Sequence, residues 1–200
     1  MTGEVISDLM RNLESGKFTF TGELEPKKTT NLEHIFESVQ RLKGYVTACN
    51  VTDNPQSFAC ISSLAASYLI QKETGMETIY QVTCRDRNRI GLLSDLLGAG
   101  ALGIKNILAL TGDYTTLGDT PQAKPVFDLD SVQLISMIRR IVDEGKDING
   151  QPIESPPKFF VGAAANPNAD PLEPELIKFA KKVSAGAQFF QTQVVFDIET

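Results

Sequence analysis

Short apolar runs alternate with amphipathic segments along the chain at roughly thirty-residue intervals, the length of a β-α-β unit. Between the runs, apolar residues recur at helical spacing. The runs themselves are short enough for buried strands and cover residues 18–24, 45–51, 78–82, 106–110, 159–163 and 188–195. The pattern predicts an opening helical segment followed by six strands that alternate with helices.

Capping and helix-breaking residues give the expected ends of the helices. Thr30 and Glu33 have the spacing of a capping box, Asp130 is placed to cap a helix, and Pro174 suits the first turn of another. The expected helix ends are Gly75, Gly98 or Gly100, and Gly186.

Alternating strands and helices favour right-handed β-α-β units and an all-parallel α/β sheet, either open and doubly wound or closed as a (β/α)8 TIM barrel. No G-x-G-x-x-G follows the first strand, and acids and amides follow several different strands, which favours the barrel. A closed barrel typically needs about 250 residues. We therefore expect residues 1–200 to form one barrel domain with about six β-α units, incomplete at the C-terminus.

Composition narrows the classes of function. The chain has 200 residues and a formal net charge of −6, which argues against a nucleic-acid or anionic-membrane surface and favours a small-molecule substrate. Residues 1–13 lack the features of a signal peptide, and no apolar run is long enough to span a bilayer, so a cytoplasmic location is expected. Three scattered cysteines and one histidine, His34, predict neither a metal site nor a Ser-His-Asp triad, and His34 is expected at the surface.

Two acidic strand ends are the candidate sites of chemistry. Asp113 follows the buried run 106–110, and Glu23 and Glu25 lie at the end of the first strand, spaced to project from the same face. Residues 111–130 form a loop longer than a simple connection needs. Both acids are expected at one rim of the sheet.

Seven stretches, in order along the chain, resemble the methylenetetrahydrofolate reductase family, a flavin-dependent (β/α)8 barrel of one-carbon metabolism. The similarity is greatest to the branch found in acetogens and in fusions with homocysteine methyltransferase. The stretches are Gly22-Glu23-Leu24-Glu25-Pro26-Lys27, Asn50-Val51-Thr52-Asp53, Thr83-Cys84-Arg85-Asp86-Arg87-Asn88, Leu108-Ala109-Leu110-Thr111-Gly112-Asp113, Val126-Phe127-Asp128-Leu129-Asp130-Ser131, Ala165-Asn166-Pro167 and Phe190-Gln191-Thr192-Gln193-Val194-Val195-Phe196-Asp197.

The resemblance implies an oxidoreductase that transfers a hydride from reduced FAD to 5,10-methylenetetrahydrofolate and forms 5-methyltetrahydrofolate. It makes Glu23 the acid that assists opening of the folate ring, which requires a pKa raised by partial burial. Asp113 would stabilise the iminium cation and lower the flavin potential. Gln193 would contact the substrate. The plainer alternative for Glu23 is a solvated strand-end glutamate, and Glu25 is the competing choice of acid. Asp113 could instead cap the segment that follows it, and Gln193 could be an ordinary strand-end amide.

For FAD, the resemblance points to residues spread along the chain, with the loop through Phe127 and Asp128 closing over the nucleotide. The implied FAD-binding residues are Asn50, Asp113, Phe127, Asp128, Asn166, Asp170 and Lys182. Lys181 and Lys182 could equally form a solvated helix face. Gln81 and Thr111 depart from the commoner family pattern, which has histidine and, in some relatives, arginine at these positions.

Two other interpretations remain open: a methyltetrahydrofolate-dependent corrinoid methyltransferase barrel that binds pterin without flavin, and a truncated, non-catalytic interaction subunit. The implied electron donor is NADH, NADPH or a redox partner subunit of the ferredoxin type. The protein is expected to form an oligomer or hetero-complex.

Overall fold

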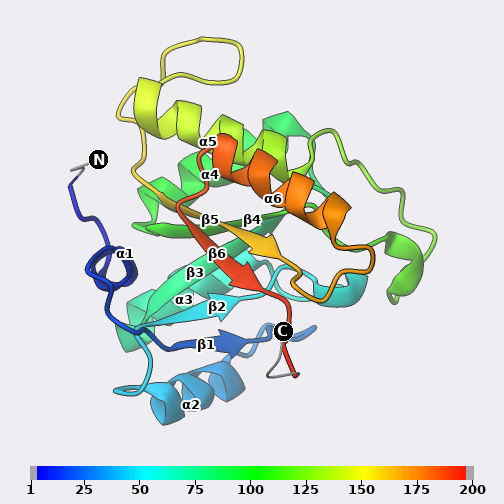
Figure 1. Cartoon of the computed structure of the whole chain (residues 1–200). Helices are drawn as coiled ribbons and strands as arrows, with labels where there is room; N and C mark the ends of the chain where they lie inside the picture. The colour runs from blue at the N-terminus through cyan, green and yellow to red at the C-terminus, as the bar shows by residue number, and fades with distance from the viewer. Residues whose placement is uncertain (1–3, 197–200) are drawn as a thin grey trace.

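The computed structural model describes residues 4–196 and contains one six-stranded parallel sheet (Figure 1). Each strand pairs with its neighbours in the chain, in the order β1 to β6. This sequential, all-parallel arrangement is an incomplete barrel of the (β/α)8 type, as predicted. The strands are β1 (Thr21–Leu24), β2 (Ala48–Val51), β3 (Glu77–Thr83), β4 (Asn106–Leu110), β5 (Phe160–Ala165) and β6 (Phe189–Thr192).

The helices form an outer layer, except for α1, which lies at the amino ends of the strands (Figure 1). The α-helices are α1 (Asp8–Glu14), α2 (Glu33–Leu42), α3 (Ser63–Thr74), α4 (Arg89–Ala101), α5 (Ser131–Glu144) and α6 (Glu173–Ser184). Two short 3₁₀ turns, η1 (Pro55–Ser57) and η2 (Thr115–Leu117), lie in the loops after β2 and β4. No helix of the described part of the chain is long and apolar enough to cross a membrane.

The period-2 alternation of strand side chains separates the core into outer and inner parts. Outward-facing residues such as Val51 and Tyr80 pack under the helices. Inward-facing Ile79, Leu108 and Phe160 pack against Leu9 of α1, which therefore closes the amino end of the barrel interior. The carboxyl end of the interior carries polar inward-facing side chains instead and can therefore form a binding site.

The strand assignments are correct in number and order, but only the fourth strand has the predicted bounds. The first, second and sixth strands are shorter than the apolar runs 18–24, 45–51 and 188–195, the third is one residue longer at each end than 78–82, and the fifth runs from Phe160 to Ala165. In the first run, Phe18 and Phe20 are 81% and 64% exposed, because the edge strand is paired only from Thr21 onward. Apolar runs locate strands but not the extent of pairing.

The predicted capping box of Thr30 and Glu33 is wrong. Helix α2 has Leu32 as its N-cap, and Asn31 Oδ1 accepts a hydrogen bond from the Glu33 main-chain N–H instead (2.8 Å). His34, expected at the surface, is half-buried: part of the residue is exposed and lines an open pocket beside Arg41, whereas its Nε2 is shielded from solvent.

Helix α4 does not end at Gly98 or Gly100. A Cβ on Gly100 would lie 2.4 Å from Pro157 Cβ, so glycine permits close packing there rather than ending the helix. Asp130 caps α5 as expected, and the structure adds Gln133 as the second residue of a capping box. Helix α3 ends at Gly75 and α6 ends next to Gly186, as expected.

Candidate functional site

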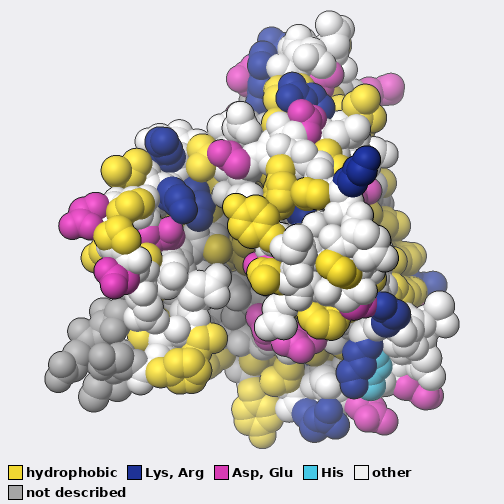
Figure 2. All heavy atoms as spheres, turned by 90° about the vertical axis from the view of Figure 1, so that its right-hand side faces the viewer, with side chains coloured by type: hydrophobic (Ala, Val, Ile, Leu, Met, Phe, Trp, Pro, Cys, Tyr) yellow, Lys and Arg dark blue, Asp and Glu magenta, His cyan; other side chains and the backbone are white. Residues whose placement is uncertain are grey.

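Two neighbouring pockets open at the carboxyl ends of the strands, the face that Figure 2 shows hollowed between its two sides. The Glu23 pocket has a volume of about 690 Å³ and is lined by Glu23, Thr52, Gln81 and residues of β4 and β6. The Lys182 pocket, about 900 Å³, is lined by Asn166, Lys178, Lys182 and residues of the α5 N-terminus. Asp113 and Gln193 line both pockets, so the two spaces meet at these side chains.

Glu23 lies on the inner face of β1, opposite Asn50 of β2 in the parallel register. The residue is open to solvent at the rim, but burial of its carboxyl raises the pKa above its usual range. The negative charge of Glu25 raises the pKa of Glu23 further. A carboxyl in this setting keeps its proton at a higher pH than a free glutamate and is suited to act as a general acid.

Asp113 is held at its place by the loop after β2. Its Oδ2 accepts a hydrogen bond from the Gln56 main-chain N–H (2.9 Å), and its main-chain carbonyl accepts one from Ser57 Oγ (3.1 Å). Gly112 precedes it with φ of +98°, and a Cβ there would come within 2.9 Å of Arg85 Cβ. The turn can therefore approach β3 closely only with glycine at this position.

The Lys182 pocket carries ammonium groups on α6 and amide side chains in the loop before it, together with the carboxylates of Glu175 and Asp130. Lys182 Nζ donates to the Ala164 carbonyl (2.5 Å), and burial lowers the pKa of Lys182. Asn166 and Lys178 line the same wall. Gln193 is anchored by its main-chain N–H, which donates to the Ala165 carbonyl (2.8 Å), and follows β6 directly.

Asn50, the remaining predicted cofactor residue of the sheet, is buried beside Glu23 but does not line either pocket. Its Nδ2 donates to the Gly22 carbonyl (3.4 Å), whereas its Oδ1 is buried and has no hydrogen-bond partner among the described residues. The structure thus places Asn50 beside Glu23 in the sheet but outside both pocket linings.

Three predicted FAD-binding residues, Phe127, Asp128 and Asp170, do not line the two pockets. Asp128 accepts hydrogen bonds from the Arg89 guanidinium (2.8 Å) on the wall of a separate pocket, and this side-chain pairing lowers the pKa of Asp128 to about 2. Phe127 packs edge-on against Tyr114, at 6.1 Å between ring centroids. The Arg89 contact holds this loop outside the linings of the two pockets, and its closure over a nucleotide stays a prediction. Asp170 is exposed in the loop before α6.

The structure adds Thr52 as a pocket residue that was not predicted from the sequence, and it places Gln81, noted above only as a departure from the family pattern, in the same pocket. The Thr52 hydroxyl is buried without a partner among the described residues. Gln81 lies in the run 78–82 and Thr52 directly follows the run 45–51, so the inward direction of their side chains was the available signal.

A buried ion-pair network underlies this rim. Asp53 accepts from the Thr83 main-chain N–H and hydroxyl (2.9 Å each) and from Arg87 Nη1 (2.7 Å), and Arg87 also donates to Asp95. In residues 4–196 there is no group of three or more His, Cys, Asp or Glu side chains that could hold a metal ion.

Fold and site together define a parallel α/β protein of the barrel type, with an acid- and amide-lined site at the carboxyl ends of its strands. Comparison of the sequence with protein families identifies which one: residues 8–200 match the family model described as "Methylenetetrahydrofolate reductase". The chain belongs to the methylenetetrahydrofolate reductase family.

Curated relatives agree with this assignment. The chain is 32% identical over 187 residues to a protein of Caenorhabditis elegans named "Probable methylenetetrahydrofolate reductase (NADPH)", covering 88% of this chain and 26% of the relative. It is 25% identical over 203 residues to the 5,10-methylenetetrahydrofolate reductase of Pectobacterium carotovorum subsp. carotovorum, covering 98% of this chain and 61% of the relative. The chain thus spans less than two thirds of these relatives.

Among solved structures, the fold is similar to that of an uncharacterized Clostridium thermocellum protein described as binding two copies of 5-methyl-5,6,7,8-tetrahydrofolic acid. The TM-score is 0.58 at 16% identity, with 96% of this chain and 59% of the other covered.

Proposed function

We propose that the full-length protein containing this chain reduces 5,10-methylenetetrahydrofolate to 5-methyltetrahydrofolate in the two joined pockets. The observation that carries the proposal is the position of Asp113 and Gln193, which line both pockets, while Glu23 lines only one. A substrate in the Glu23 pocket and a cofactor extending from the Lys182 pocket would meet beside Asp113 and Gln193.

The residues present fit FAD as the cofactor. Lys178 and Lys182 offer positive charge for a diphosphate, and the amides of Asn166 and Gln81 suit the polar edge of a heterocycle. The Thr52 hydroxyl is buried without a partner among the described residues and offers a further hydrogen bond. When bound and reduced, FAD supplies the hydride.

The chain's own residues would then act on the folate. Glu23, whose pKa is raised by burial, would give its proton to the ring nitrogen as the five-membered ring opens. Asp113 would stabilise the resulting iminium cation by its negative charge, and Gln193 would bind the pterin edge through its amide. The Clostridium thermocellum protein of similar fold, which binds a methylated folate, agrees with folate as the ligand class.

An absorption spectrum of the purified full-length protein tests the proposal. We expect flavin absorbance that is bleached by NADH, NADPH or a reduced ferredoxin-type partner and restored by 5,10-methylenetetrahydrofolate. Folate binding without any flavin absorbance, even after reconstitution with FAD, would instead support the methyltransferase-type barrel.

A further inference from the structure

The turn after β2 has an unusual backbone. Asn54, Gln56 and Ser57 have φ of 49°, 52° and 63°, although none of them is glycine. Side chains disfavour this left-handed region, so such residues persist only where their surroundings hold them, and they concentrate at functional sites. Three of them within four positions call for a specific support.

Arg85 provides that support from the end of β3. Its side chain is 2% exposed, and Nε and Nη2 bind the two oxygens of Asp86 (2.8 and 2.7 Å). Nη1 donates to the Asn54 carbonyl (3.3 Å) and to Ser57 Oγ (3.0 Å), the two ends of the strained turn. These contacts use four of the five guanidinium N–H groups, two on Asp86 and two on the turn. Arg85 lines the Glu23 pocket, but its guanidinium is therefore largely occupied within the protein.

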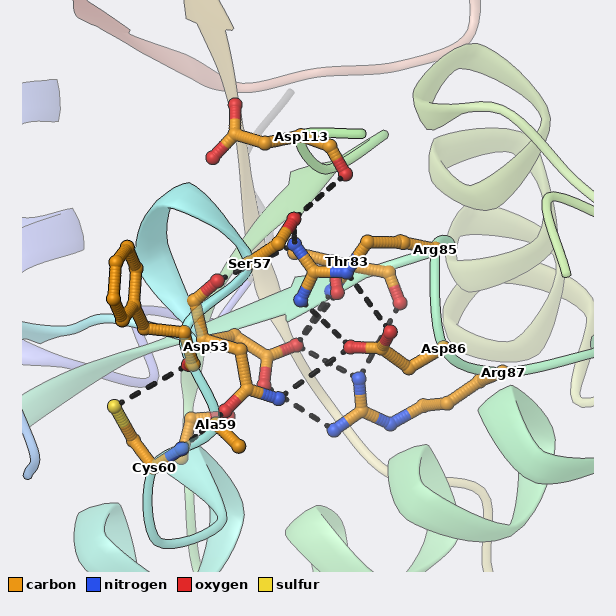
Figure 3. Close-up of polar contacts among 12 residues, drawn as sticks. Asp53, Ser57, Ala59, Cys60, Thr83, Arg85, Asp86, Arg87 and Asp113 are labelled. Atoms are coloured by element: carbon orange, nitrogen blue, oxygen red, sulfur yellow. Dashed lines mark hydrogen bonds and ion pairs between the residues drawn. The ribbon is translucent and has the colours of Figure 1, made fainter. Parts of the chain in front are cut away.

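The turn, once supported by Arg85, holds Asp113 in position. Gln56 N–H donates to Asp113 Oδ2, and the Ser57 hydroxyl, which accepts from Arg85, shares its single proton between the carbonyls of Asp113 (3.1 Å) and Tyr114 (2.9 Å). Figure 3 shows the Asp113 carbonyl turned toward Ser57 and its carboxylate directed away from Arg85. The carboxylate is thus fixed through one oxygen, and its direction is set by the turn.

Close packing makes the two loops a single unit. A Cβ on Gly118 would lie 1.9 Å from the Ser57 carbonyl oxygen, and Asp119 accepts from the Ala59 N–H (3.2 Å). Lys28 forms an ion pair with Asp119 from the side of β1. Movement of the turn therefore moves the segment that carries Asp113.

We propose that Arg85 and Ser57 are positioning residues that aim the Asp113 carboxylate at the junction of the two pockets. This inference rests on the proposed function, because Asp113 acts on the reaction only if the folate and flavin meet beside it. Arg85 and Ser57 act through Asp113 and the strained turn.

The first test is Ser57→Gly, because glycine accepts a φ of 63° and keeps the fold while it removes the hydroxyl. Misplacement of a catalytic group by about 1 Å can cost up to about 100-fold in rate. We expect the folate half-reaction of the full-length protein to slow by about tenfold or more, with little change in flavin content. Arg85→Met should behave in the same way. Ser15→Ala, which removes an exposed hydroxyl far from the pockets, is the control.

A double variant separates positioning from general damage. In the Asp113→Asn background, Ser57→Gly should change the folate half-reaction by less than about twofold, because the group it aims has already lost its charge. Additive losses would show that Ser57 acts independently of Asp113 and would overturn the inference.

The second readout needs no flavin or folate. Amide hydrogen exchange of Gln56 in the flavin-free protein reports its hydrogen bond to Asp113, and both Ser57→Gly and Gly118→Ala should accelerate it by at least about tenfold. Gly98→Ala, whose new methyl would make only an ordinary 3.8 Å contact, should not. If the wild type reduces folate but neither exchange nor rate changes in Ser57→Gly, the positioning role is wrong. If the wild type itself lacks flavin-dependent folate reduction, the proposed function is wrong instead.

Discussion

Glu23 and Glu25 line the same pocket, where burial and then the negative charge of Glu25 raise the pKa of the Glu23 carboxyl. In the proposed reaction, Glu23 donates its proton to the folate. The folate half-reaction should therefore be fast below this raised pKa and should be lost as pH rises through it.

Replacing Glu25 by Gln tests that coupling. The substitution removes the Glu25 charge, which is one of the two causes of the raised pKa of Glu23. The high-pH limb of the folate half-reaction should therefore move to lower pH, while burial keeps the pKa of Glu23 above that of a free glutamate. Stopped-flow rates measured as a function of pH check the shift, because the high-pH limb reports the pKa of the general acid. Glu14→Gln, an exposed change on α1, should leave the limb in place. If the high-pH limb of the rate profile does not move in Glu25→Gln, the titration of Glu23 is not the cause of that limb.

Substitutions of Glu23 and Asp113 should have different effects on the two half-reactions. Glu23→Gln should leave flavin binding and its reduction by the donor nearly intact and slow the folate half-reaction by about 100-fold or more, the scale of a lost general acid. Asp113→Asn should raise the flavin potential, because a negative charge is removed near the anionic reduced flavin, and should also slow hydride transfer.

Stopped-flow at the flavin absorbance separates these two effects, and equilibrium reduction against a reference dye measures the potential. If Glu25→Gln abolishes folate reduction while Glu23→Gln reacts at the wild-type rate, the assignment of the acid is reversed. If neither substitution matters, the family interpretation of β1 fails.

The sequence revealed strand order and the strand-end acids because both depend on local patterns. Apolar runs locate the strands, and the end of a run places Asp113 at the carboxyl rim in any parallel sheet. Glu23 was found in the same way. Neither assignment required knowledge of which distant residues would contact them.

The support of the site was missed because its hydrogen bonds are long-range. Arg85 contacts Ser57 across 28 positions, and Gln56 contacts Asp113 across 57, so no local period or spacing links them. The left-handed turn at Gln56 and Ser57 carries no glycine and gave no signal. The contact of Asp128 with Arg89 gave no local signal for the same reason, since the two residues are 39 positions apart.

The ion-pair network beneath the rim should be important for stability. Asp53 has a side chain that is 1% exposed and pairs with Arg87. Asp53→Asn leaves the Arg87 guanidinium, which is 16% exposed, with Asp95 as its one acidic partner among the described residues. Breaking one partner of a buried pair costs about 3–5 kcal/mol. The free energy of unfolding from urea titration should fall accordingly.

Asp143→Asn is the matched control. It removes the same charge from an i,i+4 pair with Arg139 on α5, where Asp143 is half exposed. Exposed pairs of this kind contribute about 0.2–1 kcal/mol. Equal losses in the two variants would show that the Asp53 network does not stabilise the fold beyond an ordinary surface pair.

Glu77 joins α1 to the amino end of the sheet. Its carboxylate accepts the main-chain N–H groups of Asp8 (2.8 Å) and Leu9 (3.0 Å), and also Asn106 Nδ2 (2.9 Å). These N–H groups belong to the first turn of α1 and have no acceptor within the helix. A negative charge at a helix N-terminus adds favourable electrostatics. Glu77 therefore holds the helix that closes the barrel interior.

Glu77→Ala should destabilise α1 more than the sheet. Loss of these hydrogen bonds to a charged acceptor should lower the free energy of unfolding by about 1.5–3 kcal/mol. Because Leu9 packs on the inner face of the sheet, release of α1 should also expose that face. Hydrogen exchange should rise first in residues 8–14 and then at Ile79 and Leu108, while α5 stays protected. Glu73→Ala, at an exposed position of α3, is the control. A Glu77→Ala protein whose α1 amides exchange at the wild-type rate would show that apolar packing alone keeps the helix in place.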